Sequence, residues 1–204
     1  MKKIVTVCIL FFTALCVLCT ENPSEPKDES QQGNGSNSEA QQGIVDFISV
    51  DGVTLFETTA SEIEDVLGTP RDVNQSGGYS YYYYPDKGLK FTLDRRDIVV
   101  SVNVYSSNWQ YQLGDDPVRY ARYAFQTAEG ISVGSDVVTM DSVVSRYGEP
   151  SARGNTSSQA TAETPWFFQY TDQLEERTGV MWFCFFGEDT TDYTGKPVTM
   201  IKMY

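Results

Sequence analysis

The side chains most capable of chemistry gather near the C-terminus, where a lone cysteine precedes an acidic loop. Cys184 lies in the run Met-Trp-Phe-Cys-Phe-Phe, and the chain contains no histidine. Burial among aromatic side chains raises the pKa of a thiol, and no histidine is present to activate it as a nucleophile. We therefore predict no catalytic residue and no enzymatic activity.

The acidic loop offers carboxylates of the kind that bind hard cations. It contains Glu188, Asp189 and Asp192 within five positions. The loop lacks the ligand spacing and the turn glycine of a calcium-binding loop. We predict a solvated acidic loop, with no metal and no cofactor.

A run of tyrosines is a candidate contact surface in the first half of the chain. Residues 79–84 read Tyr-Ser-Tyr-Tyr-Tyr-Tyr. Tyrosines offer contact area at a small cost in rotamer entropy, and aromatic rows also stack against sugars. The other interpretation is a half-buried strand whose hydroxyls reach water. We predict that Tyr82 and Tyr84 contact a partner.

Two segments that echo each other must position these residues. Residues 59–70 match residues 139–150 at an offset of 80 (139 minus 59). Each segment begins with a threonine suited to an N-cap, continues with apolar residues at helical spacing and ends in Gly-x-Pro. The pattern predicts two short helices, and Thr59 with Glu62 predicts a capping box at the first.

Strands are predicted after each helix. Alternating or aromatic runs, typical of strands with one buried face, occur at 79–84, 88–93, 98–105, 166–170, 179–186 and 197–204. The predicted fold class is α+β: two tandem helix-plus-three-strand modules, 44–114 and 115–204, forming an antiparallel sheet with helices packed on one face. Residues 115–126 fit either the start of a helix or an extended linker.

Aligning the two modules predicts which residues form the core. Gly88 is placed opposite Gly179, and Tyr105 opposite Tyr204. Because side chains alternate along a strand, this alignment assigns one face to the core. The predicted core residues are Leu89, Phe91, Val100, Val102, Val104, Val180, Trp182, Thr199, Ile201 and Met203.

The opposite face is polar in the first module and apolar in the second. An apolar patch on an open sheet face suggests a protein contact, and aromatic residues and Met are enriched in interfaces. The substitution Phe183→Asp is then expected to leave the protein folded. The alternative is that residues 124–131 or the N-terminal segment cover this face as a second core. The predicted partner-binding residues are Tyr82, Tyr84, Tyr105, Met181, Phe183, Phe185, Met200 and Tyr204.

The N-terminus has the features of a bacterial export signal. Two lysines precede an apolar run that is shorter than the roughly 20 residues needed to span a bilayer. The run stops at a cysteine, as in the lipobox of bacterial lipoproteins, although Leu18 stands where a small residue is usual. We predict a lipoprotein signal peptide over 1–18 and lipidation, including palmitate, at Cys19. Cys16 is the alternative, and cleavage without lipidation is the third interpretation.

Residues 19–43 are predicted to be a disordered tether. From residue 20 they consist largely of Ser, Gln, Asn, Gly, Glu and Pro, with no aromatic residue. Such a segment buries too little apolar surface to offset the entropy of ordering. The tether would hold the folded domain away from lipid headgroups.

Charge excludes several classes of partner. The chain carries 15 basic and 28 acidic residues, a net charge of −13. Nucleic-acid binding needs a basic face that neutralises phosphates, so we predict no nucleic-acid partner. Direct adhesion to anionic lipid is disfavoured for the same reason.

The Gly-Ile-Ser-Val-Gly-Ser stretch at 130–135, the helix ending in Tyr-Gly-Glu-Pro and the meander that follows resemble the β-lactamase-inhibitor-protein-like fold. The pattern is also similar to the SmpA/OmlA family of small outer-membrane lipoproteins. This resemblance implies a protein that works by binding other proteins.

The favoured hypothesis is a non-catalytic protein-binding or assembly module of the cell envelope, anchored by lipid, in the outer membrane where one exists. The partner would be an envelope protein that binds the exposed aromatic sheet face. The alternative is a receptor for a sugar or peptide in a cleft between the modules, lined by the tyrosine run and Trp166. A receptor of this kind needs a concave pocket, whereas a protein interface needs a broad surface.

Overall fold

The computed structural model describes residues 44–45, 47–113, 115–124, 126–156, 165–174 and 177–204. The predicted signal peptide, the tether and both candidate lipidation sites, Cys19 and Cys16, lie outside the described residues. All described residues belong to one compact unit, Ala40–Tyr204.

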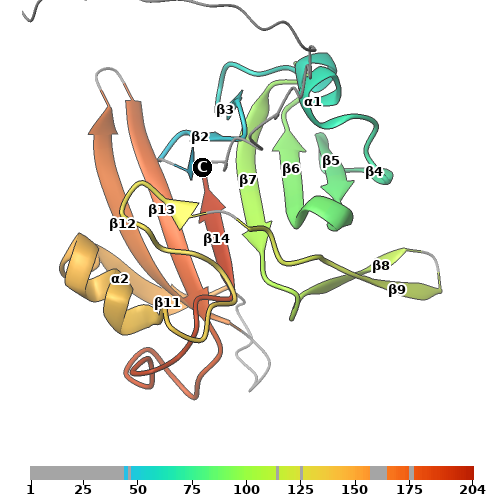
Figure 1. Ribbon diagram of the computed structural model, residues 1–204. Helices are drawn as coiled ribbons and strands as arrows, with labels where there is room; N and C mark the ends of the chain where they lie inside the picture. Colours follow the sequence, from blue (N-terminus) through green and yellow to red (C-terminus); the bar gives the residue numbers. More distant parts are fainter. Residues whose placement is uncertain (1–43, 46, 114, 125, 157–164, 175–176) are drawn as a thin grey trace, which may run out of the picture. The chain divides into compact units, whose positions relative to one another are not determined.

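An eight-stranded antiparallel sheet is the main element of this unit, in the strand order β11-β12-β13-β14-β7-β6-β5-β4 (Figure 1). At its centre β14, the last strand of the chain, pairs with β7, from Met200↔Tyr105 to Met203↔Val102. Each half of the chain therefore supplies four neighbouring strands. Their bounds are β4 Asp72–Ser76, β5 Tyr79–Tyr84, β6 Leu89–Leu93, β7 Val99–Tyr105, β11 Ala152–Asn155, β12 Trp166–Leu174, β13 Arg177–Phe185 and β14 Met200–Met203.

The predicted fold class is wrong, because the protein is mostly β rather than α+β. Strands make up 46% of the structure and helices 13%. The helices α1 (Ala60–Leu67) and α2 (Met140–Tyr147) have eight residues each. A helix of that length is about 12 Å long, whereas eight strands span about 34 Å, so these helices cannot form a layer over the sheet. Their buried side chains are Ile63 in α1 and Met140 and Val143 in α2.

The predicted ends of both helices are confirmed. Thr59 accepts a hydrogen bond from the backbone N–H of Glu62, and the Glu62 carboxylate accepts one from the Thr59 N–H at 2.8 Å. Thr139 and Ser142 form the corresponding box at α2. Gly68 and Gly148 end the helices with φ of 82° and 79°, values that glycine adopts without strain.

The module prediction missed one strand in each half, β4 and β11. Both are edge strands of the sheet, with the polar sequences Asp-Val-Asn-Gln-Ser and Ala-Arg-Gly-Asn. An edge strand with polar side chains resists pairing with another chain but carries no alternating apolar signal. The sequence pattern therefore predicts no strand in either segment.

The remaining elements are short. The segment at 115–126, which fitted either a helix or a linker, contains the extended strand β9 and no helix among its described residues. Strand β9 pairs with β8 to form a separate hairpin. In the sequence, this hairpin lies between the four strands of the first half and the four strands of the second half. These elements are β1 Ile44–Val45, β2 Ser49–Val50, β3 Val53–Thr54, η1 Pro85–Lys87, β8 Gln110–Leu113, β9 Asp116–Arg119 and β10 Gln126–Thr127.

One hydrophobic core runs along one face of the sheet, which we call the core face. Both helices, the β2–β3 turn and the segment around Ile131 and Val133 pack against it. The side chains of the opposite, outer face alternate with those of the core face along each strand. The core-face residues with no exposed surface are Leu89, Phe91, Leu93, Val99, Val102, Val104, Phe168, Met181, Phe183, Phe185, Ile201 and Met203.

In the first half the predicted core is correct except at the β-bulge, where Val99 and not the half-buried Val100 belongs to the core. Along β13 the predicted core is inverted. Lys90 pairs with Asn103, and Trp182 pairs with Lys202. When the two halves are superimposed by equivalent strands, Lys202 of β14 is equivalent to Asn103 of β7. Their pairing partners, Trp182 and Lys90, are then also equivalent, which gives β13 and β6 a sequence offset of 92 (182 minus 90). The glycine alignment implied 91 (179 minus 88). A slip of one residue exchanges the two faces of a strand, so Val180 and Trp182 lie on the outer face.

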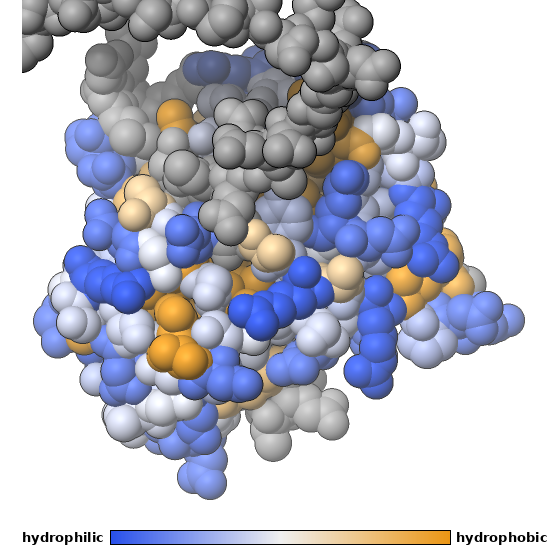
Figure 2. Space-filling model, viewed as in Figure 1, coloured by the Kyte–Doolittle hydropathy of each residue, from blue (hydrophilic) through white to orange (hydrophobic). Residues whose placement is uncertain are grey.

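Among the described residues, no helix combines the length and the hydrophobicity needed to cross a membrane. Figure 2 shows hydrophobic residues in small separate areas among hydrophilic ones on the face in view. The large hydrophobic residues that the described part exposes are dispersed in the sequence: Phe56, Val66, Val73, Tyr79 and Val137.

Candidate functional site

The outer face of the sheet is covered in one part and open in another. The cover is the β8–β9 hairpin, which leaves the end of β7 and extends toward the β5 and β4 side of the sheet (Figure 1). Tyr120 stacks on Tyr105 with ring centroids 4.1 Å apart, and Tyr111 stacks on Tyr83 at 4.4 Å. Cys184 and Met200 complete this second, smaller core.

A glycine allows the chain to return closely over the sheet after the hairpin. Gly88 has φ of 68°, and a Cβ there would lie 2.6 Å from the carbonyl oxygen of Ala121. The N–H of Ala121 donates to the carbonyl of Pro85 at 2.7 Å. The backbone thus anchors the hairpin at the start of β6.

Several polar atoms on the outer side are buried and have no hydrogen-bond partner within the described part of the chain. They are Ser101 Oγ, Ser106 Oγ, Trp109 Nε1, Tyr111 Oη and Tyr120 Oη. An unpaired buried polar group costs about 1–3 kcal/mol. The hairpin therefore covers the sheet by aromatic packing, without satisfying its polar groups.

Beside the hairpin, the outer face carries a row of half-buried residues that pair in succession across six strands, and the ring of Tyr111 covers its last member, Tyr83. We call this set the lysine row. It crosses the sheet from β12 to β5 and contains Gln169, Trp182, Lys202, Asn103, Lys90 and Tyr83.

Each lysine of the row lies against two aromatic rings. Lys202 Nζ is 5.0 Å from the ring centroid of Trp182 and 5.1 Å from that of Tyr204. Lys90 Nζ is 4.7 Å from Tyr81 and 5.2 Å from Tyr83. A cation over an aromatic face contributes about 0.5–1 kcal/mol at an exposed site.

Neither lysine forms an ion pair with a carboxylate in the described part of the chain. The ion pairs found there use Arg71, Arg96, Arg153 and Lys196. Partial burial lowers the pKa of both Lys90 and Lys202, and repulsion from Lys202 lowers the pKa of Lys90 further. The row therefore carries two positive charges that are desolvated in part and unneutralised by these carboxylates.

The remaining side chains hold the row in place. Trp182 stacks on Phe167 at 4.0 Å, and its Nε1 donates to Gln169 Oε1 at 2.9 Å. The Asn103 amide donates to the Tyr105 hydroxyl at 3.0 Å. The aromatic groups that flank the lysines are thus fixed by packing and hydrogen bonds.

The structure does not bring the predicted partner-binding residues together. Met181, Phe183 and Phe185 have no exposed surface and lie in the core, because the register of β13 is one residue from the predicted one. These three residues are removed from any contact surface of the folded protein.

The predicted tyrosines and Met200 have different positions. Tyr84 lies on the core face, 4% exposed, and Tyr82 packs against the same core. Tyr105 and Met200 are on the outer face but buried beside the hairpin. Tyr204 remains half-buried next to Lys202 and Trp182.

Sequence reasoning missed Lys90, Lys202 and Trp182 as a group. A signal was present, because lysines at interior strand positions are uncommon in an acidic domain. Their proximity depends on the β14–β7 pairing, which joins residues about 100 positions apart in the sequence (202 minus 103 is 99). No local pattern encodes that pairing.

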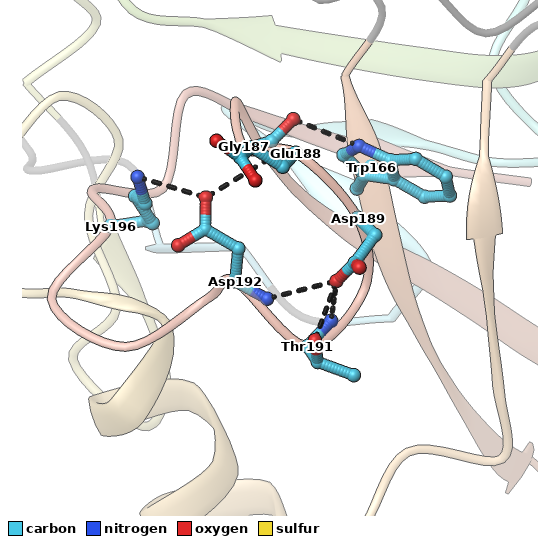
Figure 3. Close-up of polar contacts among 7 residues, drawn as sticks. All are labelled: Trp166, Gly187, Glu188, Asp189, Thr191, Asp192 and Lys196. Carbon is cyan, nitrogen blue, oxygen red and sulfur yellow. Dashed lines mark hydrogen bonds and ion pairs between the residues drawn. The ribbon is translucent and has the colours of Figure 1, made fainter.

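The other chemically capable residues form no site. Cys184 is buried, and burial raises the pKa of its thiol to about 12. In the acidic loop, Asp189 accepts hydrogen bonds from the backbone and hydroxyl of Thr191, and Asp192 from the Glu188 N–H and Lys196 (Figure 3). These bonds lower the pKa of both aspartates. Among the described residues, no group of three or more potential metal ligands is found.

Two open depressions occupy the end of the sheet formed by the β4–β5 and β6–β7 turns. They measure about 380 and 400 Å³ and share the lining residues Gly77, Gly78, Tyr79, Asp94 and Arg95. Trp166 lines neither depression; it lies on the core face and donates to the carbonyl of Gly187 (Figure 3).

Comparison with known proteins provides little further information. No protein family model matches the chain, and no curated protein matches it. A solved structure with some similarity is a DUF4309 family protein (YjgB) from Bacillus subtilis subsp. subtilis str. 168, with 11% identity and a TM-score of 0.42. The alignment covers 76% of this chain and 82% of that chain. The resemblance to the β-lactamase-inhibitor-protein-like fold and the SmpA/OmlA family stays a prediction.

Proposed function

We propose that this chain is an exported, lipid-anchored protein of the bacterial cell envelope whose folded domain binds another envelope protein without catalysing a reaction. The N-terminal sequence supports the export signal and lipidation at Cys19. The outer membrane is the favoured location where the cell has one. The contact surface is the outer face of the sheet, at the lysine row.

One observation carries this proposal. Two half-buried lysines flank Asn103 on the outer sheet face, each against aromatic rings, and neither is paired with a carboxylate in the described part of the chain. Desolvating a charge is unfavourable unless a partner compensates it. Aromatic residues are enriched at interfaces, whereas lysine is depleted there, so a partner must compensate both charges. The two charges of this surface would therefore be better stabilised in a complex than in the isolated protein.

The second candidate, a receptor for a sugar or peptide, has weaker support. The open depressions lie at turns and contain a single aromatic residue, Tyr79. A ligand pocket usually encloses most of its ligand.

Site-specific photo-crosslinking in cells tests the proposal. A photoreactive phenylalanine analogue replaces Tyr81, which flanks Lys90 on the outer face. The matched control replaces Val73, which is 45% exposed and lies on the core-face side of the same hairpin. We expect a defined envelope protein to be captured from position 81 but not from position 73. Identical products from both positions, or none from position 81, would overturn the proposed function.

A further inference from the structure

The lysine row has a charge opposite to that of the protein around it. The chain has a net charge of −13 and only 15 basic residues, and two of these occupy the centre of the outer face. Four other basic residues form ion pairs with neighbouring carboxylates. Lys90 and Lys202 differ from these four in forming no ion pair in the described part of the chain, and each lies against two aromatic rings.

The two lysines flank one strand. Both pair with Asn103 of β7, one from each side, so their Cα atoms are separated by two strand spacings, about 10 Å. A group placed over Asn103 would lie within reach of both ammonium groups. A carboxylate there would be attracted by two charges that already repel each other.

An unpaired hydroxyl lies beside this position. Ser101 is 8% exposed, and its Oγ is buried with no hydrogen-bond partner. It is on the outer face of β7, two residues from Asn103, and pairs with Thr92 of β6. A hydroxyl is both donor and acceptor, so Ser101 is a buried polar group two residues along β7 from the position between the lysines.

We propose that the lysine row binds an acidic segment of the partner protein, with a carboxylate seated over Asn103 between Lys90 and Lys202. This inference rests on the proposed protein-binding function. Charge complementarity selects the carboxylate. The rings of Trp182, Tyr204 and Tyr81 offer contacts to the neighbouring side chains of the segment.

The dimensions of the row favour a peptide over a small anion. From Gln169 to Tyr83 it crosses five strand spacings, about 24 Å, which equals about seven residues of extended chain. Phosphate sites more often use arginine forks or converging backbone N–H groups. The cations of this row are two single lysines, one on β14 and one on β6.

Nuclear magnetic resonance of the lysine side chains in the full chain, held in nonionic detergent, provides the test. The probe is a seven-residue peptide alternating Glu and Tyr, and the control peptide has Gln in place of each Glu. We expect saturable shifts of the ε-methylene signals of Lys90 and Lys202 with the acidic peptide. Lys87, exposed in the η1 turn, and Lys196, paired with Asp192, serve as internal controls.

The double variant Lys90→Gln, Lys202→Gln should weaken binding of the acidic peptide at least tenfold, and raising salt should weaken binding to the unmodified chain. Absence of shifts, or equal shifts with the Gln peptide, would overturn the inference. Equal shifts with inorganic phosphate at the same ionic strength would assign the site to small anions. Shifts produced by vesicles of anionic phospholipid, and not by the peptide, would assign it to lipid. Each variant is first shown to unfold cooperatively.

Crosslinking from position 81 separates this inference from the proposed function. Capture that persists in the double variant would refute the acidic segment and leave protein binding intact. Capture that is absent in the unmodified chain as well would refute the protein-binding function itself.

Discussion

The hydroxyl of Tyr84 donates a hydrogen bond to the carbonyl oxygen of Gly68, 3.0 Å away, and so ties the end of α1 to β5. The second half repeats this arrangement: Tyr170 of β12 donates to the carbonyl of Gly148 at the end of α2, also at 3.0 Å. Both carbonyls belong to helix ends, where backbone acceptors lack intrahelical partners. A tyrosine therefore fixes each short helix to the sheet.

Replacing Tyr84 by Phe should remove this bond and lower the free energy of unfolding by about 1 kcal/mol. Tyr170→Phe should cost a similar amount, because its bond has the same geometry. The measurement is urea-induced unfolding followed by circular dichroism. Tyr120→Phe is the matched control, since the Tyr120 hydroxyl is buried without a partner and its loss should be neutral or stabilising. An equal loss for Tyr120→Phe would contradict this interpretation.

Phe183→Ala should destabilise the protein by about 3–5 kcal/mol, because the side chain has no exposed surface and packs against Tyr147 and Tyr170. Phe183→Asp should abolish cooperative unfolding, since it buries an unpaired charge. The control Val73→Asp introduces the same charge at an exposed strand position and should leave the transition intact. Thermal unfolding distinguishes these outcomes, and a folded Phe183→Asp would restore the sequence-based assignment of β13.

The contrast between the helices and β13 shows which parts of this fold are encoded locally. The capping residues of α1 and the glycine that ends it lie within ten consecutive residues, 59–68. The local sequence alone therefore predicts where the helix begins and ends. The faces of β13 depend on its register with β14, and one residue of error exchanges Trp182 for Phe183. Both strands of this pair are rich in apolar residues on either face, so hydrophobic alternation could not correct the error.

The candidate site was less predictable than the fold. Lys90 and Asn103 were correctly placed on one face, because the first half alternates clearly. Their relation to Lys202 required knowing that the two halves join through β7 and β14. A lysine within a strand cannot be assigned to a binding site from the sequence until the residues that pair with it on neighbouring strands are known.

The Cys184 thiol should resist modification in the folded protein. It has no exposed surface, and burial raises its pKa to about 12, so thiolate is scarce at neutral pH. We expect negligible reaction with a disulfide reagent at pH 8 and complete reaction in about 6 M guanidinium. This concentration exceeds the unfolding midpoint of about 5 M above which a protein is called hyperstable, so it should unfold the domain. Rapid reaction without denaturant would show that the β8–β9 cover opens readily.

The raised thiol pKa also predicts how stability depends on pH. The folded state keeps the thiol neutral, whereas the unfolded state ionises near its ordinary value of 9.0. The contribution of Cys184 is therefore complete below that value and is lost as the pH rises from 9.0 toward about 12. Cys184→Ala should remove this part of the alkaline destabilisation, as measured by urea midpoints across the pH range.

Lys202 should cost stability at neutral pH, and this is the prediction that most directly bears on binding. Its folded-state pKa is lowered from 10.5, with partial burial as the main cause, so the charged form is disfavoured by folding. A group with a lowered folded-state pKa gives the folded protein more stability as the pH rises through the window between the lowered pKa and 10.5. The stability difference between Lys202→Met and the unmodified chain should therefore favour the variant at pH 7 and shrink in that window.

Lys87→Met, at an exposed position in the η1 turn, serves as the control and should show no such trend. The Lys202→Met variant and the unmodified chain share every titrating tyrosine and thiol. The difference between their urea midpoints therefore reports the titration of Lys202. A Lys202→Met variant that is less stable at pH 7 would mean that packing of the lysine stem on Trp182 and Tyr204 outweighs the desolvation of its charge. A more stable variant that no longer binds the acidic peptide would show that the positive charge is kept for recognition, at the expense of the stability of the fold.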